Sequence, residues 1–177
     1  MKILTFKVNK PWGRHIFDCK FCNILIDSGA EIAVWMGSAK GLLKSFPQAK
    51  REENKKSLVS GFGGDAVCFK DVYSIPSLIL RDEDNIELEL KNLNVAINDR
   101  RVKTDDEDAI DLVIPVIAFR NCNVTFVNDF MGDDYIEIIA HQEKIDCANF
   151  IAGVDGGKDV IGSSLTSLGW DDIFNLV

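Results

Sequence analysis

The segment from Ile24 to Ala30, with the sequence ILIDSGA, leads one carboxylate out of an apolar run and into a tight turn. The β-branched residues before Asp27 favour a strand, and the Ser28-Gly29 pair after it favours a turn. We therefore expect the carboxylate at the mouth of the strand, where the backbone N–H groups of Gly29 and Ala30 can point back toward its oxygens. Such a carboxylate can activate water, although Asp-Ser-Gly also occurs in ordinary turns.

Hydrolysis of a peptide bond by carboxylates requires two of them, one ionised to take a proton from water and one protonated to polarise the carbonyl. Two carboxylates about 3 Å apart cannot both ionise easily, so the pair holds one proton over a working pH range. The segment Val154-Asp155-Gly156-Gly157 superficially resembles a second catalytic turn, but too few residues follow it to build a second lobe. We expect a homodimer in which the Asp27 residues of two chains meet on the two-fold axis.

A glycine-dense segment lies between two stretches with strand character and runs from Leu58 to Gly64. Its glycines can adopt positive φ and hinge a hairpin, and an aromatic residue at the tip can contact a bound peptide. These candidate flap and substrate-binding residues are Gly61, Phe62, Gly63 and Gly64. A plain mobile hairpin without a binding role is the alternative.

Near the C-terminus, the segment Asp159–Trp170 contains the pair Ile161-Gly162. Gly162 allows close packing at the start of an expected short helix, and Leu165 and Leu168 would share one face of it.

In this order, the three segments resemble a retropepsin. In that family of aspartic proteases, a hydrophobic-Asp-Ser/Thr-Gly-Ala strand precedes a glycine-rich flap hairpin, and a hydrophobic-Ile-Gly segment then opens a short helix. The resemblance extends from about Ile16 to Trp170. It implies a homodimeric aspartic endopeptidase that acts on peptide or protein substrates without a cofactor, with Asp27 of each subunit as the catalytic pair.

The same resemblance implies that Ser28, Gly29 and Ala30 support the catalytic turn. Viral members of the family are shorter, so this chain carries extra length. We expect it in three stretches, which are Met36–Lys56, Asp99–Asp111 and Asn128–Gly157. Ile32, Val34 and Trp35 are candidates for pocket walls or, equally, for the core.

Strand signals dominate the rest of the chain, and Gly, Asn, Asp or Pro clusters separate them. We predict a single domain over residues 1–177 that is mainly β, a closed or sandwich-like retropepsin barrel with a flap hairpin and one or two short helices. The predicted strands are Ile3–Val8, His15–Cys19, Asn23–Ile26, Ala66–Val72, Ser77–Leu80, Ile86–Leu90, Val113–Phe119, Val124–Phe126 and Tyr135–Ala140. One helix is predicted over Lys40–Phe46, ended by Pro47, and the tract Arg81–Asn85 is predicted as an exposed hairpin loop.

Five cysteines, an odd number, argue against a complete disulfide framework. Cys68, Cys122 and Cys147 have apolar neighbours and are expected in the core. Cys19 and Cys22 form a CxxC that is half of a possible zinc site, but no second pair completes four ligands. We therefore expect a hairpin tip there and no metal.

A net charge of −8 disfavours binding to nucleic-acid phosphate, and the basic residues form no dense stripe. The cluster from Lys50 to Lys56 is interrupted by acids and indicates a solvated loop or helix end. The longest apolar run, Leu112 to Phe119, is too short for a membrane span. The N-terminus lacks the features of a secretory signal, so we expect a cytoplasmic protein.

Neither His15 nor His141 is accompanied by a serine or cysteine nucleophile motif, so no triad chemistry is expected. A second hypothesis belongs to another class of protein. The same fold without catalysis would serve as a retropepsin-like peptide-binding or dimerisation module.

Overall fold

The structure is a computed structural model that describes residues 1–8, 16–19, 21–53, 57–60, 66–69, 71–99, 109–128 and 133–148. These residues are mainly β, as the sequence predicts. The strands are β1 (Lys2–Lys7), β2 (Ile16–Cys19), β3 (Cys22–Asp27), β4 (Ala33–Trp35), β5 (Lys50–Arg51), β6 (Ser57–Ser60), β7 (Ala66–Phe69), β8 (Val72–Arg81), β9 (Glu87–Ile97), β10 (Leu112–Pro115), β11 (Cys122–Val127), β12 (Tyr135–Ala140) and β13 (Lys144–Asp146). The helices are α1 (Ala39–Ser45) and the 3₁₀ helix η1 (Val116–Ala118).

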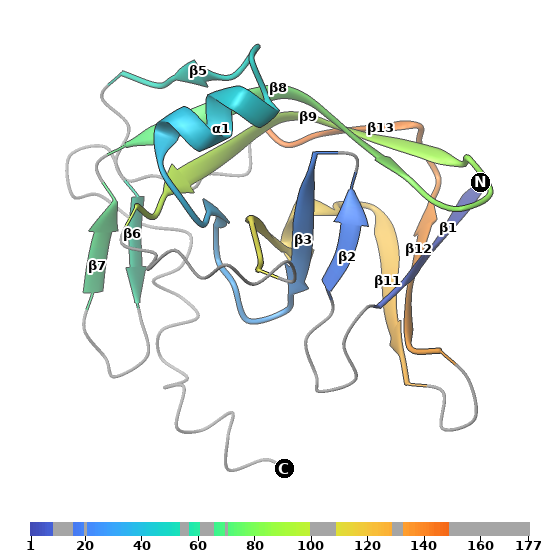
Figure 1. Cartoon of the computed structure of the whole chain (residues 1–177). Coiled ribbons are helices and arrows are strands. Elements are labelled where there is room, and N and C mark those ends of the chain that lie inside the picture. Colours follow the sequence, from blue (N-terminus) through green and yellow to red (C-terminus); the bar gives the residue numbers. More distant parts are fainter. Residues whose placement is uncertain are drawn as a thin grey trace, which may run out of the picture.

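The largest sheet has the strand order β2-β3-β10-β4-β9-β8-β5. The long strand β9 pairs with β8 along one side, and with β4 and β13 at opposite ends of its other side. A second sheet has the order β1-β12-β11, and β6 and β7 form a separate hairpin. Figure 1 shows the β8–β9 hairpin running across the top of the molecule, with α1 at its left end and the three-stranded sheet at the right.

Alternating burial along the strands creates one core shared by the two larger sheets. In β3, Cys22, Ile24 and Ile26 are buried while the residues between them are half-buried, as expected when successive side chains point to opposite faces. Residues from both sheets belong to the same apolar cluster. The Phe6 ring of β1 also stacks on the Phe17 ring of β2, with centroids 4.3 Å apart. The two sheets therefore form one packed unit.

The helix predicted over Lys40–Phe46 is confirmed as α1. Ser38 caps its N-terminus, because the Ser38 hydroxyl accepts a hydrogen bond from the Gly41 N–H at 3.2 Å. Leu42 and Phe46 reach the core, so apolar spacing and a polar cap act together. No helix in the described part of the chain is long and apolar enough to cross a membrane.

The described strands form open sheets and no closed barrel. The prediction of a closed barrel is therefore wrong for this part of the chain. The large sheet ends at β2 and β5, and β2 does not pair with β8 to close it. The two strands are joined instead by a side-chain contact, in which the Cys19 thiol points to the Ile79 carbonyl with Sγ 3.8 Å from the oxygen. Closure needs a continuous ladder of backbone hydrogen bonds, and this contact does not supply one.

Several strand boundaries also differ from the prediction. The predicted strand Val113–Phe119 is wrong beyond Pro115, because the chain turns there into η1. Proline has no N–H to donate, so it is suited to the end of a strand. The predicted Ala66–Val72 is divided between β7 and β8, and Ile86–Leu90 extends to Ile97 within β9. The short strand β5 lies within the cluster that was expected to be a solvated loop or helix end, and it pairs with β8.

Candidate functional site

Asp27 is the last residue of β3, as the sequence predicts. Its Oδ1 accepts a hydrogen bond from the Gly29 N–H at 2.8 Å, while Ala30 supplies no such bond among the described residues. The side chain of Asp27 is half-buried, and Ser28 beside it is exposed. The turn therefore presents a carboxylate that the backbone of the same turn holds in place.

The strand β10 lies between β3 and β4, although β3 and β4 follow each other in the sequence. It runs parallel to β3 with Pro115 opposite Asp27, and antiparallel to β4 with Leu112 opposite Trp35. The turn after Asp27 must therefore pass the end of an inserted strand and cover about 10 Å, which is twice the usual interstrand spacing. Because β3 and β10 are parallel, their carboxyl ends meet at this turn. In open α/β sheets, ligands commonly bind outside the carboxyl ends of parallel strands, and this turn has the corresponding position.

Polar contacts at the opposite end of β3 set this register. The Asn23 N–H donates to Asp111 Oδ2 at 3.0 Å, and the Asp111 N–H donates to the Asn23 carbonyl at 3.0 Å. The Asn23 amide also donates to the Ala109 carbonyl at 3.2 Å, and the Asp111 carbonyl accepts from the Met36 N–H at 2.7 Å. A slip of β10 by one residue would break these bonds and remove Pro115 from its place beside Asp27.

These positioning residues were not identified from the sequence. Asn23 is only the first residue of a predicted strand, and Asp111 is only the last residue of an expected insertion. The available signal was a single Asp directly before the apolar run that begins at Leu112. It could not identify its partner, because the two residues are 88 positions apart.

Apolar side chains surround the turn. Ile32 and Trp35 are both 5% exposed, which places them in the core and not in an open pocket wall. Val34 is half-buried and packs against Ile32 and Ala96. Glu31, within the turn, is partly buried, and this desolvation raises the pKa of its carboxyl group. A second carboxyl group, with a raised pKa, is thus present in the loop that follows Asp27.

The strands on both sides of the expected flap tip form a hairpin. The strands β6 and β7 pair in antiparallel register from Ser57 opposite Phe69 to Ser60 opposite Ala66. The tip residues Gly61, Phe62, Gly63 and Gly64 lie outside the described residues. So do His15, the Val154–Gly157 segment and the helix expected at Ile161-Gly162.

The CxxC is a hairpin tip, as expected, with Cys19 directly opposite Cys22 in the β2–β3 pair. Neither cysteine forms a disulfide bond, and neither do Cys122 and Cys147. Cys147 is buried as predicted, whereas Cys122 is half-buried at the margin of the core. The side chain of Cys68 lies outside the described residues. Among the residues that the structure describes, no group of three or more His, Cys, Asp or Glu side chains could hold a metal ion.

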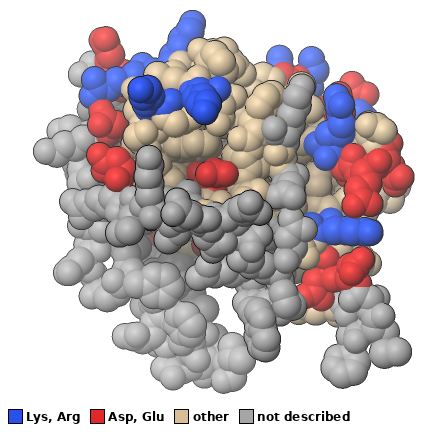
Figure 2. Space-filling model, in the orientation of Figure 1, with Lys and Arg blue, Asp and Glu red and all other residues tan. Residues whose placement is uncertain are grey.

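Charged side chains on the face seen in Figure 2 occur in small groups of mixed sign, and the described basic residues form no continuous stripe there. His141, the described histidine, is exposed. The chemistry that the described site offers is therefore that of a carboxylate in a tight turn.

Comparison with known proteins finds no match to this chain among family models, curated proteins or solved structures.

Proposed function

We propose that this protein is a retropepsin-like aspartic endopeptidase that acts as a homodimer. The observation that carries the proposal is the Asp27 turn. It places a half-buried carboxylate at the joined carboxyl ends of two parallel strands, with its Oδ1 held by the Gly29 N–H. A rigid carboxylate at the end of a central strand is suited to proton transfer, because strands position a reacting group more precisely than free loops.

In the proposed dimer, the Asp27 carboxylates of two chains share one proton. The Gly29 N–H orients each carboxylate, and one of the two takes a proton from water. The other Asp27 carries the shared proton and polarises the scissile carbonyl of the substrate. Ser28 is exposed beside the carboxylate, where its hydroxyl is available to the partner's backbone, and Gly29 permits a close approach of the two turns.

The substrate of this reaction is an extended peptide. The β6–β7 hairpin is the element proposed to close over it as a flap, with Gly61, Phe62, Gly63 and Gly64 at its tip. An extended substrate can add backbone hydrogen bonds to a hairpin edge, and closure excludes water from the carboxylates.

The test compares the wild type with Asp27→Asn on a denatured protein mixture at acidic and neutral pH, with new peptide ends identified by mass spectrometry. Cleavage should occur with the wild type and vanish with Asp27→Asn. The matched control is Asp84→Asn, which changes an exposed carboxylate in the β8–β9 turn and should cleave normally. Proteolysis that survives in Asp27→Asn would refute the assigned site.

A non-catalytic peptide-binding or dimerisation module is the second candidate. The hydrogen bonds between Asn23 and Asp111 favour this candidate, because they set the register of β3 and β10 and do not involve the Asp27 carboxylate. The fold at this turn therefore does not require a catalytic role for Asp27. Sedimentation of the wild type and Asp27→Asn distinguishes the candidates when read together with cleavage. Dimers without cleavage by either protein would favour the module, and monomers at all concentrations would refute the shared site.

A further inference from the structure

Two cysteine thiols face each other at the end of the β2–β3 hairpin, far from the Asp27 turn along β3. Cys19 and Cys22 are directly opposite in the antiparallel register, and their side chains are hydrogen-bonded to each other. Cys19 is half-buried, while Cys22 is 6% exposed. The hairpin therefore holds one accessible thiol against one protected thiol.

The geometry of this pair suits a disulfide bond. Residues at the first and fourth positions of a β-turn have Cα atoms less than about 7 Å apart, and a disulfide requires Cα atoms about 4.4–6.8 Å apart. Because the two side chains already contact each other, the bond can form with little movement of the backbone. Such a bond closes a loop of only four residues and restricts the unfolded chain little, so it should be easily reduced.

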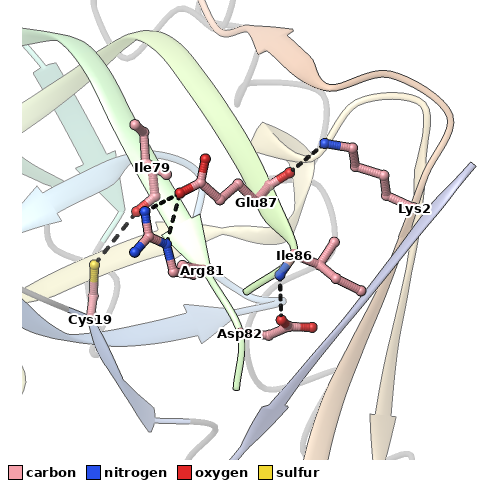
Figure 3. A network of polar contacts seen from close by, with 7 residues as sticks. All are labelled: Lys2, Cys19, Ile79, Arg81, Asp82, Ile86 and Glu87. Carbon is pink, nitrogen blue, oxygen red and sulfur yellow. Dashed lines mark hydrogen bonds and ion pairs between the residues drawn. The ribbon is translucent and has the colours of Figure 1, made fainter. Parts of the chain in front are cut away.

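Cys19 also borders an open groove of about 550 Å³. Its thiol points toward the Ile79 carbonyl on β8, as Figure 3 shows. The groove has apolar walls at Phe21 and Ile79, which are 53% and 48% exposed, and a cationic side chain from Lys44. Arg81 also lines the groove, but its guanidinium forms an ion pair with Glu87 (Figure 3). The exposed Lys44 can thus attract a small anionic molecule toward the Cys19 sulfur, although the net charge of the whole chain is −8.

The other described cysteines lack this combination. Cys147 is 1% exposed, and its thiol points to the carbonyls of Ala118 and Ile145. Cys122 lies on β11 opposite Ala140, so it faces no cysteine in its strand pair. Among the described cysteines, Cys19 and Cys22 therefore combine two features. They lie opposite each other in a strand pair, and a groove lies beside one of them.

We propose that Cys19 and Cys22 form a reversible dithiol–disulfide site, oxidised by exchange with a small anionic disulfide such as oxidised glutathione bound in the groove beside Cys19. The Cys19 thiolate attacks one glutathione sulfur, the glutathione S–S bond breaks, and the first glutathione leaves with the proton that Cys19 released. The Cys22 thiolate then attacks the Cys19 sulfur, and the second glutathione leaves with the Cys22 proton. Two protein thiols are oxidised, and one glutathione disulfide is reduced to two glutathione thiols.

The order of attack follows from the surroundings of the two sulfurs. The hydrogen bond with Cys19 and burial raise the pKa of the Cys22 thiol, and the nearby Asp111 carboxylate acts in the same direction. Cys22 is therefore the weaker first nucleophile. Once Cys19 is held in a mixed disulfide, Cys22 lies directly beside the sulfur that it must attack.

The test equilibrates the purified protein in buffers of stepped oxidised-to-reduced glutathione ratio. The samples are quenched with acid, and the free thiols are alkylated in denaturant and mapped by mass spectrometry. The expected product is a Cys19–Cys22 disulfide, identified by a peptide mass that is lower by two hydrogen atoms. Its amount should rise as the ratio becomes more oxidising and fall again when the ratio is reversed. Cys122 and Cys147 should be alkylated at every ratio. If both thiols remain alkylatable at every ratio, or if the bond maps to another pair, the proposal is refuted.

Variants test the order of the steps and the role of the groove. Cys22→Ser should stop at a mixed disulfide on Cys19, and Cys19→Ser should leave Cys22 unmodified. Lys44→Glu should slow the first step about three- to tenfold at low ionic strength, whereas Lys40→Glu, on the same helix but outside the groove, should not. Equal rates for the two lysine variants would overturn the assignment of the groove. None of these measurements depends on peptidase activity.

Discussion

Asp82 connects the two larger sheets, and its removal tests how they are held together. It lies in the β8–β9 turn and is only 8% exposed, although the tract was predicted as an exposed loop. Its Oδ1 accepts from the Ile86 N–H at 2.8 Å within the turn (Figure 3), and its Oδ2 accepts from the Thr5 N–H of β1 at 3.2 Å. One carboxylate therefore closes the turn and binds it to the neighbouring sheet.

The expected loss of folding stability in Asp82→Ala follows from these two hydrogen bonds. A hydrogen bond to a charged group contributes about 1.5–3 kcal/mol, and the variant leaves two backbone donors without their acceptor. We use the lower end of that range because water can partly replace the bond at Thr5, which is exposed. Asp82→Ala should lower the free energy of unfolding by about 3 kcal/mol, which corresponds to a decrease of roughly 6–12 °C in Tm.

Urea titration followed by tryptophan fluorescence measures this change, because the buried Trp35 reports on the core. The matched control is Asp84→Ala, which removes an exposed carboxylate from the same turn and should change stability by less than about 0.5 kcal/mol. Asp82→Asn keeps one acceptor oxygen and should fall between the two. Equal midpoints for Asp82→Ala and Asp84→Ala would refute the reasoning.

Two further predictions concern stability. Gly41→Ala should stabilise the protein by about 0.5–1 kcal/mol in thermal unfolding, because alanine favours the helix and its Cβ would make ordinary contacts of 3.6–3.8 Å with Trp35 and Ser38. Gly37→Ala should show no such gain, since its Cβ would lie 3.2 Å from Trp35 Nε1. Burial, with a smaller effect of the Asp146 carboxylate, raises the pKa of Cys147 from 9.0 to about 11, so the unfolded chain loses this proton at lower pH than the folded protein. Stability should therefore fall by about 1.4 kcal/mol per pH unit between pH 9 and 11, and Cys147→Ala should flatten that slope in denaturant titrations.

Local signals in the sequence were sufficient for the elements that depend on neighbouring residues. The strand into Asp27, its turn and the bond from Gly29 follow from a β-branched run ahead of Ser-Gly. The helix α1 follows from apolar residues at helical spacing that are followed by a proline. The hairpins β2–β3 and β6–β7 follow from paired strand signals around short turns.

The pairing of distant strands was decided by the tertiary structure. No local pattern indicates that β10 inserts between β3 and β4, because that choice depends on packing and on the contact of Asn23 with Asp111 across 88 positions. The burial of Asp82 has the same origin, since its partner Thr5 is 77 positions away. The sequence by itself determined a carboxylate in a tight turn, whereas the packing of the sheets determined which strand lies beside it. The alternation of buried and exposed side chains along a strand, and the residue preferences of turns, depend on a few neighbouring residues. The order of strands in a sheet depends instead on how whole sheet faces are buried against each other.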